Sequence, residues 1–427
     1  MYGAVGLGQC GMKILDQLYM NLKGEKTFLD FFKQDPSVFI TPVCITSGFT
    51  DYYRACPNLR KAFKLDPVVG IGIDGSCVAP ALGKTDQTDF EGRVKGGMGA
   101  TPWKGHILLE EHQNEFLPEF RRFLHLKMGE NGPPVILMAF GAGGGTGSGT
   151  APKIAEFLKL IYPNTPIIAV AVLPAEESEG YMRAWNAVWN ITKMLDLVDG
   201  LIVVDNQVVL ERGHGAFIEK IPVFNEMVVD SLKNLVLDLI VSIQDSTGKL
   251  NLPAFDIADY IRALAYMPGK PGIASIGRSQ MFLSFSETML PFLSKDKTQQ
   301  VADEAMKCWS KQLMTGLEET LPVSAAMVFK VNKKYLNKIY FETITKDQEG
   351  RLTRKELHHG VVPTDNPEIS VTTSFTYRPQ DVGRLKELEV KGNAWARKTL
   401  REASKTSPDE AQALFDNVTE MEFFSGG

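Results

Sequence analysis

The sequence predicts an α/β protein, in which a parallel sheet flanked by helices is followed by a smaller domain that mixes strands and helices. Up to about residue 245, short apolar runs alternate with longer helical patterns, which is typical of a parallel sheet with crossover helices. Beyond about residue 270, strand-like runs return with a helical pattern among them. A chain of 427 residues is long enough for at least two domains.

Short apolar runs in the first half are predicted to be buried strands. Each run is too short for a full helix, and several are bounded by Gly or Pro. The predicted strands are Tyr2–Val5, Phe39–Ile45, Val68–Ile73, Pro134–Phe140, Pro166–Val172 and Gly200–Val204. Together they predict a Rossmann-like parallel sheet, and most of them end in a loop rich in Gly, Asp or Pro.

The second half begins after a long helix. Residues 225–243 carry apolar side chains on more than one helical face, which predicts a largely buried helix. Further on, we expect strands at Ile273–Phe285, Ala325–Val331, Ile339–Thr345 and Ile369–Tyr377, and helices at Gln299–Glu319 and 381–404. The C-terminal end is expected to be a mobile acidic tail.

Composition excludes several classes of protein. Hydrophobic residues at 44% and charged residues at 23% are typical of globular chains, and no apolar run approaches the roughly 20 residues of a membrane-spanning helix. A net charge of −5 without a dense Lys/Arg block argues against nucleic acid as a partner. The chain enters a strand-like run at once, without the pattern of a secretory signal, so we expect a cytoplasmic protein.

Cysteines and histidines suggest no metal site. The five cysteines are scattered without a Cys-x-x-Cys pair, which predicts neither a disulfide framework nor a zinc site. The adjacent His358 and His359 lie in a polar stretch and are expected to face solvent.

A first glycine loop follows the first predicted strand. Residues 6–11 read Gly-Leu-Gly-Gln-Cys-Gly and open a helix, which is the strand-loop-helix context of a phosphate-binding turn. The spacing also fits the dinucleotide fingerprint, so an NAD(P)-dependent oxidoreductase is an alternative. That fingerprint expects an acid at the end of the second strand, where this chain has Thr46, Ser47 and Gly48.

A second and richer glycine loop follows the strand predicted at Pro134–Phe140. Residues 141–150 read Gly-Ala-Gly-Gly-Gly-Thr-Gly-Ser-Gly-Thr and again open a helix. So many glycines cost backbone entropy on folding, and close wrapping of a polyphosphate is a reason for them. The segment contains no Gly-Lys-Ser/Thr, so the lysine clamp of P-loop enzymes is not available here.

These loops resemble those of the tubulin/FtsZ superfamily. Residues 143–149 resemble its signature loop, and residues 8–11 resemble the first nucleotide loop of tubulins. Residues 93–100 and the segment from Leu173 to Gly180 are similar to archaeal CetZ proteins. The resemblance implies a tubulin/FtsZ fold with a Rossmann-like GTPase domain (1–222), a central helix and catalytic loop (223–268), an activation domain (269–380), and a C-terminal helix with acidic tail (381–427).

The resemblance also implies a site for GTP or GDP. The phosphates and sugar would lie on the glycine loops, with Gly97, Gly99 and Ala100 near the terminal phosphate. Glu179 and Arg183 would contact ribose and phosphate, and Asn206 and Asn225 would read guanine, whose edge an Asn amide can pair with. The implied residues are Gly8, Gln9, Cys10, Gly11, Gly97, Gly99, Ala100, Gly143, Gly144, Gly145, Thr146, Gly147, Ser148, Gly149, Glu179, Arg183, Asn206 and Asn225. Glu179 as an ordinary helix-start acid and Asn225 as a helix cap are structural alternatives.

Two acids follow the central helix. Asp256 and Asp259, three residues apart, fall on one face of a starting helix. The segment resembles the loop that, in tubulin-like proteins, inserts into the nucleotide pocket of the next subunit, which implies Asp259 as the main catalytic acid and Asp256 as its companion. An ordinary acidic helix start is the alternative. Mg²⁺ is the expected companion of a triphosphate, with no ligands identified.

The resemblance therefore implies a cytoskeletal GTPase that polymerises head to tail and hydrolyses GTP where subunits meet, in control of archaeal cell shape. Filaments of the plasmid- or phage-partitioning TubZ kind or the FtsZ division kind are alternatives. A tubulin-like scaffold without hydrolysis is a further alternative, and the acidic tail is a candidate site for another protein.

Overall fold

The computed structural model describes residues 2–25, 35–83, 87–94, 96–175, 179–212, 225–237, 256–284, 287, 296–317, 320–406 and 416–424. The predicted boundary at 222/223 and the predicted helix beyond residue 237 lie outside these residues. The strands of the first half are β1 (Tyr2–Leu7), β2 (Ile40–Thr46), β3 (Val68–Ile71), β4 (Cys77–Val78), β5 (Ile136–Gly141), β6 (Ile167–Leu173) and β7 (Gly200–Asp205). Those of the second half are β8 (Ala265–Met267), β9 (Lys270–Pro271), β10 (Ile273–Phe282), β11 (Ser324–Asn332), β12 (Glu356–Thr364) and β13 (Glu368–Tyr377).

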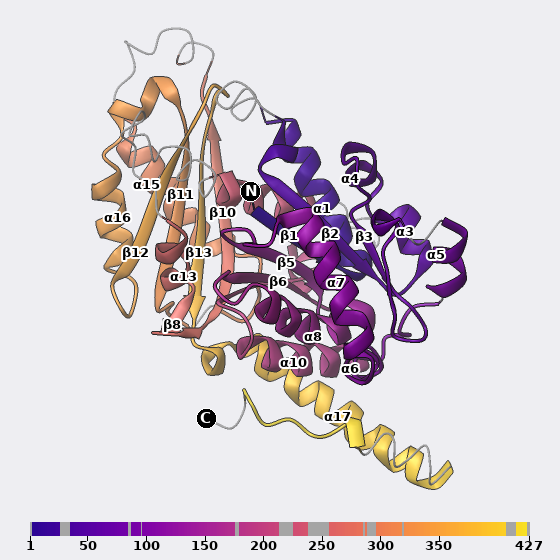
Figure 1. Cartoon of the computed structure of the whole chain (residues 1–427). Coiled ribbons are helices and arrows are strands. Elements are labelled where there is room, and N and C mark those ends of the chain that lie inside the picture. The colour runs from indigo at the N-terminus through magenta and orange to yellow at the C-terminus, as the bar shows by residue number, and fades with distance from the viewer. Residues whose placement is uncertain are drawn as a thin grey trace.

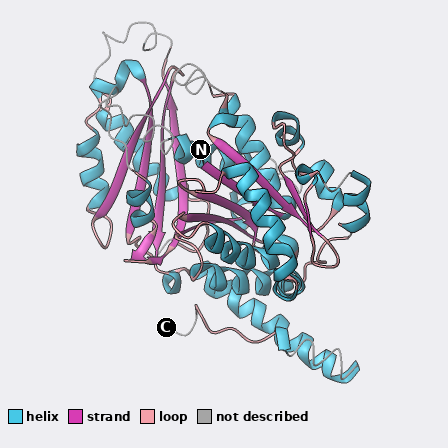
Figure 2. Ribbon diagram, in the orientation of Figure 1, coloured by secondary structure: helices cyan, strands magenta, loops and turns pink. Residues whose placement is uncertain are grey.

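One sheet of eleven strands runs through the described part of the chain, in the order β12-β11-β13-β10-β7-β6-β5-β1-β2-β3-β4 (Figures 1 and 2). From β3 to β7 all neighbours are parallel. Their order, β3-β2-β1-β5-β6-β7, is that of a doubly wound nucleotide-binding sheet, which reverses between β1 and β5. The predicted α/β fold with its parallel sheet is confirmed.

Helices cover both faces of the parallel half. They are α1 (Gly8–Lys23), α3 (Phe49–Arg54), α4 (Pro57–Ala62), α5 (Gln87–Arg93), α6 (Pro102–Glu111), α7 (Gln113–Met128), α8 (Thr146–Ile161), α10 (Tyr181–Leu195) and α11 (Gln207–Arg212). Alternate residues of a strand face opposite sides, so Val5 and Leu7 join the core under α7, α8 and α10, whereas Tyr2 and Ala4 join the core under α1. Burial on both faces explains why these strands read as continuous apolar runs.

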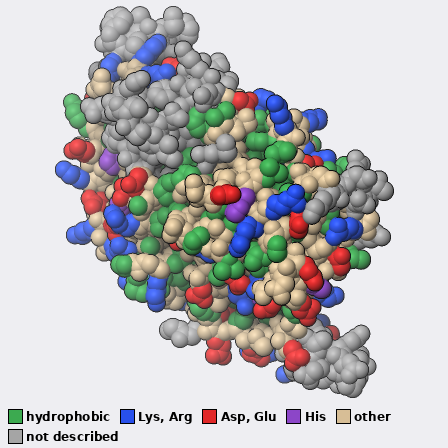
Figure 3. All heavy atoms as spheres, viewed as in Figure 1, with side chains coloured by type: hydrophobic (Ala, Val, Ile, Leu, Met, Phe, Trp, Pro, Cys, Tyr) green, Lys and Arg blue, Asp and Glu red, His purple; other side chains and the backbone are tan. Residues whose placement is uncertain are grey.

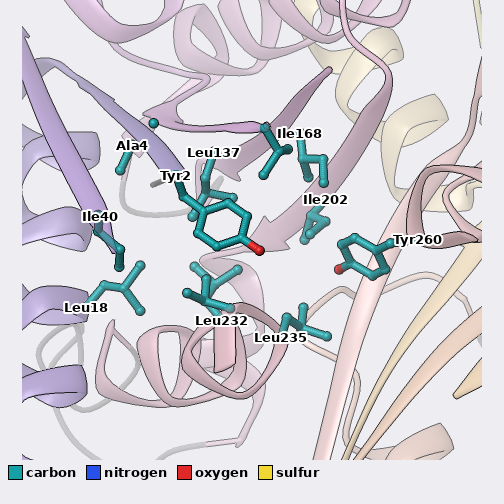
Figure 4. Close-up of a pocket in the computed structure, with 13 residues that line it drawn as sticks. Tyr2, Ala4, Leu18, Ile40, Leu137, Ile168, Ile202, Leu232, Leu235 and Tyr260 are labelled. Atoms are coloured by element: carbon teal, nitrogen blue, oxygen red, sulfur yellow. The ribbon is translucent and has the colours of Figure 1, made fainter. Parts of the chain in front are cut away.

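Residues 225–237 form a helix, as predicted for this stretch. This helix packs against the core that lies under α1. Leu232 and Leu235 of this helix point toward Tyr2 and Ile202 of the sheet across a small apolar cavity of about 30 Å³ (Figure 4). Tyr260, from α13 (Ile257–Ala263), lies at the same cavity. The central helix therefore packs on the sheet mainly through aliphatic side chains.

The second half continues the sheet. β10 pairs in parallel with β7 at Ile273 and Ala274 and runs antiparallel to β13 along its whole length. The helices here are α15 (Thr298–Ser310), α16 (Phe341–Glu349) and α17 (Gly383–Thr406). The strands predicted to begin at Ile273, Ala325 and Ile369 are present as β10, β11 and β13.

Two expectations for this half were wrong. The stretch Ile339–Thr345, predicted as a strand from its β-branched and aromatic residues, enters α16, whose buried side chains include Phe341, Ile344 and Gln348 at helical spacing. The helix predicted over Gln299–Glu319 ends at Ser310, because the chain then turns to run along the sheet, where Leu313 N–H donates to the Ile276 carbonyl at 2.8 Å.

The C-terminal segment is packed in its described part, so the prediction of a mobile tail was wrong for residues 416–424. α17 lies along α10 at the bottom of the view in Figure 1. The following segment returns onto both helices: Trp185 Nε1 donates to the Thr419 carbonyl at 3.0 Å, and Asn393 and Met421 exchange two hydrogen bonds. Phe424 is fully buried at the end of this segment.

Within the described residues, no helix is both long and apolar enough to cross a bilayer. On the face shown in Figure 3, the acidic and basic side chains that are drawn in colour are interspersed.

Candidate functional site

A cavity of about 290 Å³ opens at the carboxyl edge of the parallel strands. Its walls are the loops that follow β1, β5, β6 and β7, and it therefore lies at the point where the strand order reverses between β1 and β5. The residues that line it are Leu7, Gly8, Gln9, Cys10, Asp51, Gly141, Gly143, Gly144, Gly145, Thr146, Gly147, Val172, Pro174, Glu179, Arg183 and Asn206. Eleven of the eighteen nucleotide-binding residues predicted from the sequence are in this set.

The two glycine loops touch each other through their backbones. Gly8 has a left-handed φ of +62°, and a Cβ atom there would lie 3.0 Å from the backbone nitrogen of Gly147. α1 begins at Gly8 and α8 begins at Thr146, and neither helix has a side-chain cap on its first N–H groups. Two helix N-termini with free N–H groups at one cavity favour a bound anion.

A third loop, at residues 96–101, adjoins the cavity without lining it. Gly96, Gly97, Gly99 and Ala100 all have positive φ, which is unusual for the non-glycine Ala100 at +57°. A Cβ atom on Gly145 would lie 2.7 Å from the Ala100 nitrogen, so this loop is in backbone contact with the second glycine loop. Ala100 of this loop therefore lies against the second glycine loop, but Gly97, Gly99 and Ala100 are not among the residues that line the cavity.

The remaining predicted loop residues, Gly11, Ser148 and Gly149, do not line the cavity but pack against the elements around it. Gly11 faces β5, where a Cβ atom would lie 1.9 Å from the Ala139 carbonyl oxygen, and one on Gly149 would lie 2.2 Å from the Pro102 carbonyl oxygen. Ser148 is fully buried inside α8. Pro152 has no N–H for the Ser148 carbonyl, which instead accepts a hydrogen bond from Asn190 Nδ2 at 2.6 Å.

Glu179, Arg183 and Asn206 form one polar cluster at the cavity. Arg183 Nη1 donates to Glu179 Oε1 at 2.6 Å, and Glu179 Oε2 accepts from Asn206 Nδ2 at 3.3 Å and from the Ala175 N–H at 2.7 Å. The carboxylate of Glu179 is therefore fixed between the loop after β6 and the residue that follows β7. These contacts orient all three side chains beside the two glycine loops.

Two residues of the cavity have shifted pKa values. Burial, followed by the nearby Glu179, raises the pKa of the Cys10 thiol to about 12, so the thiol is neutral at pH 7 and a poor nucleophile. Burial also raises the pKa of Asp51, against a hydrogen bond from Thr46 Oγ1. Asp51 was missed as a cavity residue because it lies beyond the end of β2, in α3.

Asn225, Asp256 and Asp259 are not among the residues that line the cavity. Asn225 is the first helical residue of the described 225–237 segment, and residues 213–224 before it are not described. α13 packs against β8, β11 and β12, on the side of the second half of the chain. Asp256 Oδ1 accepts the N–H of Asp259 at 2.8 Å as the N-cap of this helix, so its carboxylate also has a structural role.

Asp259 is partly exposed and has two cationic or titratable neighbours. Arg262 Nη1 lies 3.3 Å from its Oδ1, and His358 Nδ1 lies 3.7 Å from the same atom. His358 is only 18% exposed and also contacts Glu356, so the expectation that it faces solvent was wrong. No sequence signal links β12 to α13, since the two are about one hundred residues apart.

The described residues offer limited protein ligation for a metal. They contain no group of three or more His, Cys, Asp or Glu side chains that could hold a metal ion. The carboxylates that line the cavity are Asp51 and Glu179, and Glu179 is paired with Arg183. This composition fits a cation such as Mg²⁺ that keeps water and substrate phosphates as most of its ligands.

The fold and these loops define an α/β protein with two glycine-rich helix starts at the carboxyl edge of its parallel strands. Residues 105–213 match the family model described as Tubulin/FtsZ family, GTPase domain. Over this segment the chain is similar to the tubulin/FtsZ family, and the similar curated proteins include archaeal CetZ proteins.

Three comparisons define this similarity. The chain is 27% identical to the tubulin-like protein CetZ of Pyrococcus horikoshii over 262 residues, which are 61% of this chain and 58% of that protein. It is 25% identical to CetZ3 of Haloferax volcanii over an alignment of 448 residues, covering 98% and 99% of the two chains. The structure of CetZ2 from Haloferax volcanii, a GTPγS-bound protofilament, shares the fold with a TM-score of 0.66 at 18% identity, covering 94% and 99%.

The match to the Pyrococcus protein thus spans less than two thirds of that relative's length.

Proposed function

We propose that this chain is a cytoplasmic GTPase that binds GTP and GDP in the cavity between β1 and β5 and polymerises head to tail. The observation that carries the proposal is the backbone contact between the two glycine loops, from which two helices start at the same cavity. A phosphate chain along these loops would accept hydrogen bonds from the N–H groups of both helix starts and from the Thr146 hydroxyl.

The polar cluster suits the sugar and the base. The carboxylate of Glu179 is fixed by Arg183 and Asn206 and is positioned to accept a hydrogen bond from a ribose hydroxyl, while Arg183 supplies positive charge to the phosphates. The amide of Asn206 offers a donor and an acceptor to the guanine edge, with Asn225 as the second reader. Because adenine presents a different edge, these amides would favour GTP over ATP.

Hydrolysis is proposed at the contact between subunits. Asp256 and Asp259 do not line the cavity of their own chain. A head-to-tail neighbour would bring α13 over the cavity, where Asp259 orients and polarises the attacking water and Asp256 assists. Such a heterologous contact repeats without closing, so it produces an open filament. The structure of CetZ2 from Haloferax volcanii as a GTPγS-bound protofilament supports self-association by similarity of fold.

Mg²⁺ belongs to this proposal as the ion that neutralises the triphosphate. Asp51 is the cavity carboxylate available to it, directly or through water, and phosphate oxygens and water would supply the other ligands.

Cell shape is the proposed cellular role because the similar curated proteins include archaeal CetZ proteins, which the sequence also resembles. Partitioning or division filaments, a scaffold without hydrolysis and a dinucleotide-dependent oxidoreductase are the alternatives.

The division of the chain into domains at residues 222, 268 and 380 is also part of the proposal. A protein partner at the C-terminal segment is proposed too, since Phe423 there is 47% exposed.

The test is nucleotide binding, with GTP, GDP, ATP and NADH titrated against the purified chain in Mg²⁺ buffer and the pellet assayed after centrifugation. We expect GTP and GDP to bind, ATP to bind at least tenfold more weakly, and GTP to produce sedimentable polymer. NADH binding without guanine binding would replace the proposal by the oxidoreductase, and guanine binding without phosphate release would leave the scaffold.

A further inference from the structure

Asn186 joins two loops that flank the candidate nucleotide site. This residue lies on α10, one turn beyond Arg183, and is fully buried. Its Nδ2 donates to the carbonyl oxygen of Ala100 at 2.9 Å and to that of Gly143 at 3.0 Å. An Asn amide nitrogen carries two hydrogens, so each loop receives one of them.

The loop that contains Ala100 needs such support. Its backbone has four left-handed residues between 96 and 100, and the one at Ala100 is unfavourable for a residue with a Cβ atom. The conformation must therefore be maintained by contacts outside the loop. Besides Asn186, these include the approach to Gly145 and the hydrogen bond from the Gly97 N–H to the Ser47 carbonyl at 3.2 Å.

Asn186 acts through the loops and does not line the cavity. Its backbone carbonyl accepts a hydrogen bond from the Ser148 hydroxyl at 3.3 Å, which ties α10 to α8 as well. Its Oδ1 atom is buried and has no hydrogen-bond partner in the described residues, so the polar contribution of this side chain is its two donors.

We propose that Asn186 is a positioning residue that fixes the 97–100 loop against Gly143 and thereby makes the site distinguish a nucleoside triphosphate from a diphosphate. The proposal rests on the proposed function, extended by the resemblance that puts Gly97, Gly99 and Ala100 near the terminal phosphate; the close approach of Ala100 to Gly145 of the cavity wall supports this placement. GDP lacks that phosphate, so GTP binding depends on the position of this loop more strongly than GDP binding does.

The experiment compares two buried Asn→Leu variants in monomeric protein, at concentrations too low for assembly. Asn186→Leu keeps the size of the side chain and removes both donors. Asn234→Leu is the matched control, because Asn234 is also buried, donates to Thr372 Oγ1 at 3.0 Å and has an unpartnered Oδ1, but lies in the central helix. Kd values for GDP and GTPγS are measured by competition against a fluorescent GDP.

We expect N186L to weaken GTPγS binding about tenfold while GDP binding changes less than about twofold. The ratio of the two Kd values should stay at the wild-type value in N234L. Equal losses for both nucleotides in N186L, or the same change of ratio in N234L, would overturn the positioning role. If N186L does not fold, Asn186→Ser is measured in the same way, with the same selective loss of GTPγS expected.

The wild-type titration separates the two proposals. A wild-type chain that binds neither nucleotide contradicts the proposed function itself. A wild-type chain that binds both, with an unchanged ratio in the Asn186 variants, contradicts only the inference about this residue.

Discussion

The guanidinium of Arg384 donates from Nε to Asp205 Oδ2 at 2.9 Å across 179 positions of sequence, with both side chains buried. Arg384 Nη2 also donates to the Pro174 carbonyl at 3.1 Å. Asp205 directly precedes Asn206, and Pro174 lines the cavity. The start of α17 is therefore bonded to two of the loops that form the candidate site.

Breaking this pair should destabilise the fold. Arg384→Met leaves the buried carboxylate of Asp205 without its cation, for which we expect a loss of about 3–5 kcal/mol in the free energy of unfolding by urea denaturation. Arg351→Met removes an exposed ion pair with Asp347 and should have no measurable effect. Equal stabilities of the two variants would refute the account of the buried pair.

The Arg384→Met variant should also recover stability in acid. Burial raises the pKa of Asp205, against the lowering effect of Arg384, so loss of Arg384 raises it further. An acid whose folded pKa lies above its unfolded value of about 3.9 holds its proton better in the folded state, so stability falls as pH rises through the folded pKa and returns on acidification. The deficit relative to wild type should shrink as the pH is lowered from 8 toward the unfolded pKa of about 3.9, and a constant deficit would contradict this.

The role of Asp259 is tested by Asp259→Ala. If this acid orients the attacking water, GTP turnover should fall about a hundredfold or more, while the Kd for GDP is unchanged because the acid does not line the cavity of its own chain. Asp303→Ala, at an exposed position of α15, is the control and should keep wild-type turnover. Unchanged turnover in D259A would remove it from the catalytic proposal.

Asp256 requires a substitution that separates capping from catalysis. Asp256→Ser retains a side-chain acceptor for the Asp259 N–H and should keep stability, whereas Asp256→Ala loses the cap and about 1 kcal/mol. As a companion acid, Asp256 should lose turnover in both variants. Normal turnover in D256S would assign the carboxylate to capping alone.

Gly11 and Gly144 have different roles, the first in folding and the second in nucleotide binding. Gly11→Ala should prevent folding or cost more than about 4 kcal/mol, because its Cβ atom would lie 1.9 Å from the Ala139 carbonyl oxygen. Gly144→Ala meets no atom closer than 3.8 Å and should fold normally, yet bind nucleotide more weakly because Gly144 lines the cavity. Thermal melting and nucleotide titration of both variants check this, and a G144A protein with full affinity would contradict close wrapping by this loop.

The apolar contact of the central helix gives a further stability prediction. Leu232→Ala should cost about 2–5 kcal/mol, because Leu232 is 1% exposed and borders a cavity that the change enlarges. Met227→Ala on the same helix, at 45% exposure, should change stability by less than about 0.5 kcal/mol. Similar effects at the two positions would show that this helix does not pack as described.

The parallel half was predictable because its strands are buried on both faces. Ile167–Leu173 and Gly200–Asp205 are apolar runs bounded by glycine, proline and acidic residues. These two strands follow each other along the chain and are neighbours in the sheet. The second half was harder. β12 begins with Glu, Leu and two His residues, so its pairing with β11 has no local signal.

The lining of the site was predicted from its glycines, but the side chains that support it were not. Asn186 and Arg384 bond to backbone or side-chain atoms that lie 43 to 210 positions away in sequence. An Asn within an amphipathic helix or an Arg at a helix start carries no pattern that identifies such partners. Only the folded chain brings these groups together.

The central claim, an active site completed by a neighbouring subunit, is tested most directly by phosphate release from GTP·Mg²⁺ at a series of protein concentrations, with pelleting of the same samples. The account predicts that turnover per subunit rises with concentration and follows the amount of polymer in the pellet. Turnover per subunit that is independent of concentration would contradict a shared site and assign hydrolysis to the single chain.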